Sequence, residues 1–171
     1  MRLELLPESR VLIDLQATGL LRAVGHDPTL VARPEPATLD LDAGELTLVF
    51  PVRDIAVPED LSASDRERML DNLRSAEVLD ATRSPTVVLK GAFRGDRGGG
   101  TLDGKLSVRG AWHPLRVVLR GSPPGDVLGA KGEWEGTLTA LGVKPFKALL
   151  GALKLKDWIR LRVEARLREV D

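Results

Sequence analysis

The sequence has no cysteine, few aromatic residues, no excess charge and no long apolar run. The absence of cysteine excludes disulfides and thiolate metal sites. Lys plus Arg and Asp plus Glu are balanced at 25 each, and only three Trp and three Phe are present. We therefore expect no nucleic-acid binding, which favours a basic excess and aromatic side chains for stacking. No segment approaches the roughly 20 apolar residues of a membrane-spanning helix.

The N-terminal segment does not resemble a secretory signal. Residues 1–10 include Glu4, Pro7 and Glu8 and contain no apolar stretch followed by a small-residue cleavage site. We therefore expect a cytoplasmic protein, or a periplasmic one if a leader has been removed. A chain of 171 residues is long enough to bury one core, and residues 1–171 are expected to form a single domain.

What the sequence does contain is a period-two alternation, clearest between residues 157 and 169. Its apolar members are Ile159, Leu161, Val163, Ala165 and Leu167, and its charged members are Arg160, Arg162, Glu164, Arg166 and Arg168. A period of two places the apolar side chains on one face of a strand and the charges on the other, solvated face. Weaker alternation recurs along most of the chain and predicts roughly eight strands.

Two segments change to helical spacing. Ser64 and Glu67 fit a capping box, and the pattern predicts a helix over about residues 65–76. A second helix is predicted over residues 145–155, with an apolar stripe formed by Phe146, Leu149, Leu150 and Leu153. This second helix either caps one end of the fold or, because lysines surround its stripe, makes transient contact with a membrane.

The order of these elements predicts an all-β fold with one or two short helices. Local turns and the lack of a βαβ rhythm favour a closed eight-stranded antiparallel β-barrel, which leaves no exposed strand edge. Such a barrel is either filled by its own side chains or holds one small ligand. The predicted apolar lining consists of Val11, Ile13, Leu15, Leu48, Phe50, Phe93, Leu106, Val108, Trp134, Leu138, Ile159, Leu161 and Val163.

The two histidines are the remaining candidates for chemistry. His26 precedes Asp27, and His113 lies between Trp112 and Pro114. Imidazole and carboxylate groups can bind zinc, but the sequence has no HxH, HxxxH or HExxH spacing, so we expect no metal site. The histidines either bond the backbone at turns or contact a ligand head group at the cavity mouth.

Several segments, in order, resemble those of the YceI-like family. They are residues 9–13 (SRVLI), 18–26 (TGLLRAVGH), 46–52 (LTLVFPV), 78–85 (VLDATRSP) and 102–110 (LDGKLSVRG). The resemblance covers nearly the whole chain. It implies a lipocalin-like eight-stranded barrel whose apolar cavity holds a polyisoprenoid or another lipid chain, and it implies homodimers in several members.

The sequence and the resemblance together predict a carrier rather than an enzyme. We expect it to bind a hydrophobic small molecule, an isoprenoid or a fatty-acyl lipid, without a cofactor. Two alternatives stay open. One is a metal-assisted enzyme that uses His26, Asp27 and His113 at the barrel mouth. The other is a structural or stress-related domain with a filled barrel.

Overall fold

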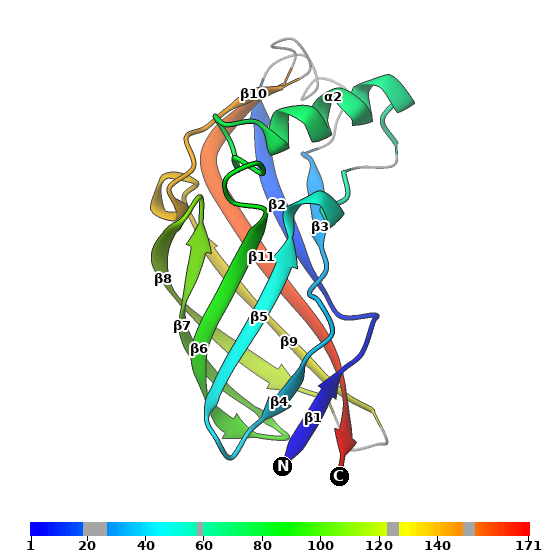
Figure 1. Ribbon diagram of the computed structural model, residues 1–171, viewed down its shortest axis with the longest axis vertical. Coiled ribbons are helices and arrows are strands. Elements are labelled where there is room, and N and C mark those ends of the chain that lie inside the picture. The colour runs from blue at the N-terminus through cyan, green and yellow to red at the C-terminus, as the bar shows by residue number, and fades with distance from the viewer. Residues whose placement is uncertain (19–26, 58–59, 123–126, 149–152) are drawn as a thin grey trace.

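A computed structural model describes residues 1–18, 27–57, 60–122, 127–148 and 153–171. Its strands form one curled antiparallel sheet, with the helix α2 (Ala63–Arg74) across one end and both chain termini at the other (Figure 1). No helix in these ranges has the length and apolar character needed to cross a bilayer.

Eight strands follow one another around the sheet in the order β3-β2-β11-β9-β8-β7-β6-β5, and three short strands extend it. The strands are β1 (Arg2–Leu5), β2 (Arg10–Thr18), β3 (Thr29–Ala32), β4 (Thr38–Asp40), β5 (Glu45–Pro51), β6 (Thr86–Asp96), β7 (Gly99–Val108), β8 (Ala111–Gly121), β9 (Val127–Gly136), β10 (Lys147–Ala148) and β11 (Leu153–Val170). β1 pairs with β4 and β11, and β10 pairs with β11.

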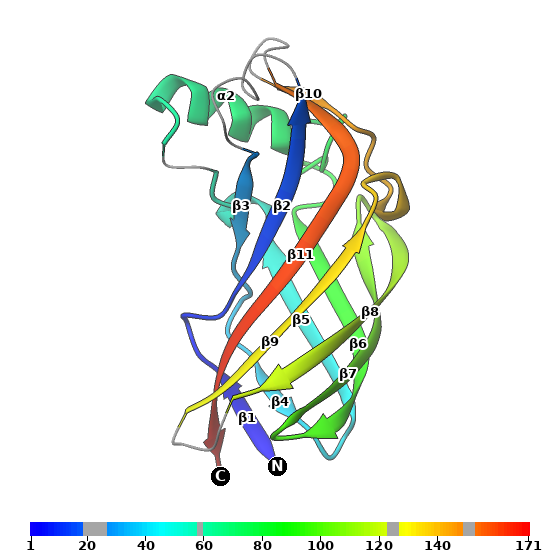
Figure 2. The ribbon, with the colours of Figure 1, turned by 180° about the vertical axis from the view of Figure 1, so that it is seen from behind.

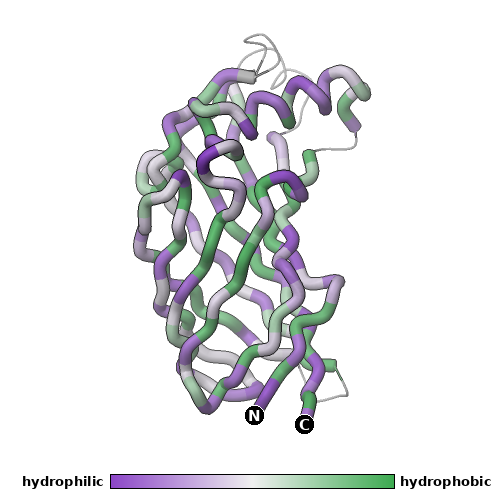
Figure 3. The backbone as a smooth tube through the Cα atoms, in the orientation of Figure 1, coloured by the Kyte–Doolittle hydropathy of each residue, from purple (hydrophilic) through white to green (hydrophobic). Residues whose placement is uncertain are grey.

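The longest strand, β11, carries the alternation that dominates the sequence. It lies between β2 and β9 along most of its length (Figure 2). Ile159 and Leu161 belong to the core or pack against it, while Arg160 and Arg162 lie on the outer face. Apolar and polar residues alternate in the same way along the neighbouring strands (Figure 3).

β3 and β5, the first and last strands in this order, approach each other without forming a ladder among the described residues. Val31 in β3 makes an isolated antiparallel bridge with Ala56, which follows β5. Beyond β3, Glu35 N–H donates to Val49 O at 2.7 Å. The structure is therefore mainly β with a curled antiparallel sheet, as predicted, whereas a closed eight-strand ladder is not among these pairings.

The first predicted helix is present and begins two residues early. Ser62, rather than Ser64, is the N-cap, because its Oγ accepts a hydrogen bond from Asp65 N–H at 3.1 Å. The buried side chains of Met69 and Leu73 belong to the main core. α2 therefore covers one end of the curled sheet with its apolar face.

The second predicted helix is wrong. Lys147 and Ala148 form β10, which pairs with Lys154 and Leu153 at the start of β11, while Leu149 and Leu150 lie outside the described residues. The helical spacing of the apolar residues competes here with a period-two pattern, in which Leu155 is buried between exposed Lys154 and Lys156. The pairing of residues 147–148 with the start of β11 favours the strand over the helix. Apolar and polar residues also alternate over residues 133–140, but the strand ends at Gly136 and a 3₁₀-helix, η2 (Thr139–Leu141), follows Leu138.

Two glycines allow β6 and β7 to bend sharply against each other. Gly91 and Gly104 are direct cross-strand partners. A Cβ atom at Gly91 would lie 2.7 Å from Asp103 O, and one at Gly104 would lie 2.5 Å from Lys90 O. Since Cβ atoms do not approach backbone oxygen so closely, the curvature of the sheet at this point requires glycine in both strands.

A buried carboxylate ties three strands together on the outer face. Asp14 of β2 accepts hydrogen bonds from Arg162 Nε and Nη2 at 2.6 and 2.8 Å, from Arg160 Nε at 2.9 Å and from Thr29 Oγ1 at 2.8 Å. Burial by itself would raise the pKa of Asp14, but the bonds from Arg162, Thr29 and Arg160 outweigh it and lower the pKa from 3.8 to about 2.

Replacing Asp14 by Asn should lower the free energy of unfolding at pH 7 by about 1–2 kcal/mol, since its arginine partners are partly solvated. Because folding lowers the pKa, the carboxylate contributes fully above 3.8, loses its contribution as the pH falls towards 2 and contributes nothing below that. Urea unfolding of both proteins at pH 7 and pH 3 measures the difference. A gap of the same size at both pH values would contradict the assignment.

Candidate functional site

The interior of the curled sheet contains an apolar cavity of about 140 Å³ at the end where the chain termini lie. We call it the termini-end cavity. Strands from both ends of the sequence build its wall, since Leu3 and Leu5 come from β1 and Leu167 from β11. Its other apolar lining residues are Val11, Leu39, Leu41, Leu46, Leu48, Phe50, Leu89, Phe93, Leu102, Leu119, Leu128, Ala130, Val163 and Ala165.

A second apolar cavity of about 100 Å³ lies at the opposite end, beneath α2. We call it the helix-end cavity. Leu73 of α2 and Val78, which follows the helix, close it from above. Its remaining lining residues are Ile13, Leu15, Leu30, Ile55, Leu79, Val87, Leu106, Val108, Leu138, Leu141, Val143, Phe146, Ile159 and Leu161.

All but one of the thirteen apolar residues predicted to line the interior line one of these cavities. The termini-end cavity contains Val11, Leu48, Phe50, Phe93 and Val163, and the helix-end cavity contains Ile13, Leu15, Leu106, Val108, Leu138, Ile159 and Leu161. Trp134 lines neither, although it packs against the same core cluster. The alternation therefore identifies the inward face correctly but does not reveal that the interior is divided.

The division occurs between consecutive inward residues of the same strand. On β11, Val163 lines the termini-end cavity and Leu161 the helix-end cavity, and on β2 the change falls between Val11 and Ile13. The two cavities are therefore stacked end to end along the strands.

On the β8–β9 side, the inward-facing side chains of Val117 and Trp134 belong to the core cluster without lining either cavity. Val117 directly precedes Val118, Trp134 directly follows Glu133, and Val118 and Glu133 are cross-strand partners. The Trp134 ring occupies the space over Gly136, where a Cβ atom would lie 2.5 Å from the ring. We call Val117 and Trp134 the partition.

Several lining residues were not predicted from the sequence, although some of them follow a period-two pattern. Leu3 and Leu5 alternate with Arg2 and Glu4 and form the strand β1, which the sequence analysis did not predict. Leu73 and Val78 line the helix-end cavity from outside the sheet, so no strand pattern could place them there.

The chemistry of both linings is that of an apolar binding site. Asp96 and Arg97, in the β6–β7 hairpin, are the charged members of the termini-end lining, and Arg97 Nη2 is 2.5 Å from Glu169 Oε2. All the residues that line the helix-end cavity are aliphatic or aromatic. An interior of this kind can enclose an apolar molecule, and it places charged groups only at its termini-end rim.

Neither Asp27 nor His113 lines either cavity. His26 lies outside the described residues, and Asp27 Oδ1 accepts a hydrogen bond from Ala17 N–H at 3.0 Å. His113 lies in β8 with its ring against Gly142, and its buried Nε2 has no hydrogen-bond partner in the described structure. Among the residues described, His, Asp and Glu form no cluster of three that could hold a metal ion.

Known structures with the same architecture include those of two bacterial proteins. Burkholderia cenocepacia BcnA superimposes with a TM-score of 0.66 at 13% identity, over 93% of this chain and 96% of that chain. A Campylobacter jejuni YceI protein, in a mutant crystal structure with a monobromobimane guest, gives 0.58 at 11% identity over 92% and 86%. Neither a protein-family model nor a curated protein sequence matches the chain. On this structural similarity, the chain has a YceI-like fold.

Proposed function

We propose that this protein binds an elongated apolar molecule, a polyisoprenoid or a fatty-acyl lipid, along the interior of its β-sheet. The observation that carries the proposal is the pair of apolar cavities stacked end to end between α2 and the chain termini. Their walls are aliphatic and aromatic, so the protein acts as a carrier that shields its ligand from water and not as an enzyme. The YceI-like fold supports a binding role in the barrel interior.

The sizes of the cavities define how such a ligand would enter. Volumes of about 140 and 100 Å³ are smaller than the roughly 300–1,000 Å³ of ordinary ligand pockets. A long chain therefore needs both cavities, and the partition has to move aside to connect them. Each methylene group that becomes buried contributes about 0.8 kcal/mol, so a chain that spans both cavities gains far more than one that fills either alone.

Native mass spectrometry of the purified protein, followed by lipid extraction, tests the proposal directly. A carrier is expected to retain a lipid or to take up added polyprenols in a one-to-one complex. If the purified protein holds no lipid and ignores added polyprenols and fatty acids, its barrel is filled by its own side chains and the proposal is wrong.

Filling either cavity should weaken the binding of a long chain. We expect Val163→Phe, in the termini-end cavity, and Leu161→Phe, in the helix-end cavity, each to weaken polyprenol binding by about tenfold or more, because the loss of two buried methylenes already costs about 1.6 kcal/mol. Titration of a fluorescent polyprenyl analogue measures the effect.

Val118→Phe is the matched control for this experiment. Val118 is 59% exposed, lies on β8, and the same substitution there adds the same side chain outside the sheet. Its affinity should equal that of the wild type. Equal losses in the inner and outer variants would show that the ligand does not occupy the interior.

Removing the partition should have opposite effects on stability and on binding. Trp134→Ala is expected to lower the free energy of unfolding by about 3 kcal/mol, because it deletes a large core side chain. The same change joins the two cavities and should increase the affinity for a long polyprenol relative to a short one. Chemical unfolding and competition between farnesol and a longer polyprenol measure the two quantities, and an unchanged length preference would contradict the role of Trp134.

A further inference from the structure

The outer face of the sheet carries a row of charged side chains that the interior site does not involve. Arg120 of β8 lies opposite Lys131 of β9, Lys131 opposite Glu164 of β11, and Glu164 opposite Arg10 of β2. Arg33 directly follows Ala32, the last residue of β3, and Ala32 pairs with Val11, the residue after Arg10. With strands about 4.8 Å apart, this row of five side chains extends across about 19 Å of the surface.

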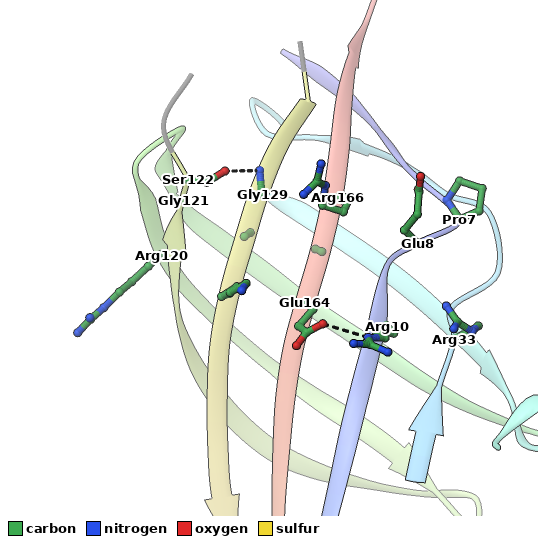
Figure 4. Close-up of a pocket in the computed structure, with 13 residues that line it drawn as sticks. Pro7, Glu8, Arg10, Arg33, Arg120, Gly121, Ser122, Gly129, Glu164 and Arg166 are labelled. Atoms are coloured by element: carbon green, nitrogen blue, oxygen red, sulfur yellow. Dashed lines mark hydrogen bonds and ion pairs between the residues drawn. The ribbon is translucent and has the colours of Figure 1, made fainter. Parts of the chain in front are cut away.

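The row lines a groove of about 1190 Å³ on the outside of the sheet (Figure 4). Its charged lining residues are Arg10, Arg33, Arg120, Lys131, Arg166, Glu8 and Glu164. Five cations and two carboxylates leave an excess of three positive charges in a chain whose net charge is zero. The groove is therefore a local concentration of positive charge.

Several arginines elsewhere on the protein surface have carboxylate partners. These ion pairs are Arg162–Asp14, Arg168–Glu4, Arg116–Asp103 and Arg97–Glu169. In the groove, Arg10 has such a partner, since its Nε is 3.0 Å from Glu164 Oε2. Within the described residues, Arg33, Arg120, Lys131 and Arg166 make no ion pair.

The direct cross-strand pairing of Arg120 with Lys131 is unfavourable for the stability of the fold. Like charges on directly paired residues of neighbouring strands repel each other and destabilise the sheet. A carboxylate at either position would have formed a favourable pair, as at Asp103 and Arg116 on β7 and β8. The arrangement is therefore unfavourable for stability alone and favourable for attracting an anion.

The floor of the groove leaves room for a bound group. It contains Gly121, Gly129, Ala130 and Ala165, which have no side chain beyond Cβ. Long cationic side chains thus surround a surface of small residues; Arg120 extends away from the other labelled side chains in Figure 4 and has to change rotamer to reach an anion that rests there. The groove lining contains no aromatic side chain, so bases of a nucleic acid would find nothing on which to stack.

We propose that this groove binds a phosphate-bearing anion, either free in solution or as the head group of a lipid. Guanidinium groups form paired, charge-assisted hydrogen bonds with phosphate oxygens, and three unpaired arginines and a lysine supply several such donors. The site lies on the opposite face of β9 and β11 from the apolar cavities and does not depend on the proposed function.

Titration calorimetry with sodium pyrophosphate, and co-sedimentation with phosphatidylglycerol or phosphatidylcholine vesicles, test the two sources of phosphate. We expect binding at low ionic strength that weakens with added salt. The double variant Arg120→Gln/Lys131→Gln should lose about tenfold or more in affinity, because it removes two charge-assisted contacts. Binding of pyrophosphate identifies a free anion, and binding of phosphatidylglycerol vesicles alone identifies a lipid head group.

The matched control is Arg68→Gln/Arg83→Gln, which removes the same charge at two exposed residues outside the groove. It should bind as the wild type does. Glu8→Gln removes a carboxylate from the groove and should tighten binding, an effect that misfolding cannot imitate. No binding of either probe, or equal losses in the two double variants, would overturn the proposal.

Discussion

The alternation of β11 is the constraint on which the rest of the structure depends. This 18-residue strand pairs with β2 and β9 along its length and with β1 and β10 near its ends. A slip of one residue in any of these ladders would turn apolar side chains outward and charges inward. The position of Leu161 and Val163 inside the sheet therefore determines which face of each neighbouring strand turns towards the apolar interior. It also determines where the cavities and the outer groove can form.

The sequence predicts most of this arrangement where one pattern acts alone. Strong alternation identifies β11, helical spacing identifies α2, and twelve predicted lining residues line a cavity. Residues 145–155 were misjudged because helical and period-two patterns coexist there, and pairing with β11 is a tertiary effect. The position of the Trp134 ring over Gly136 could not be predicted from the sequence either, since it depends on tertiary packing. His26 lies outside the described residues, so its predicted role stays a prediction.

The two proposed binding surfaces occupy opposite faces of the same strands. Inside, the aliphatic walls favour a molecule without charge, and outside, the unpaired arginines favour an anion. Gly121, Gly129, Ala130 and Ala165 line both the termini-end cavity and the groove. Only backbone and Cβ atoms of these four residues separate the two surfaces there, so the sheet is thinnest where its inner and outer sites approach each other.

The position of β11 also sets the order in which the molecule can be assembled during synthesis. β2 and β9 are separated by nearly two thirds of the chain and are joined in the sheet through β11, which follows every other strand in the sequence. Until its residues leave the ribosome, the hairpins from β5 to β9 have no link to β2 and β3 through this ladder, and their apolar faces stay open. Completion of the fold therefore waits for contacts between distant parts of the chain, which form slowly and leave a nascent apolar surface in need of protection.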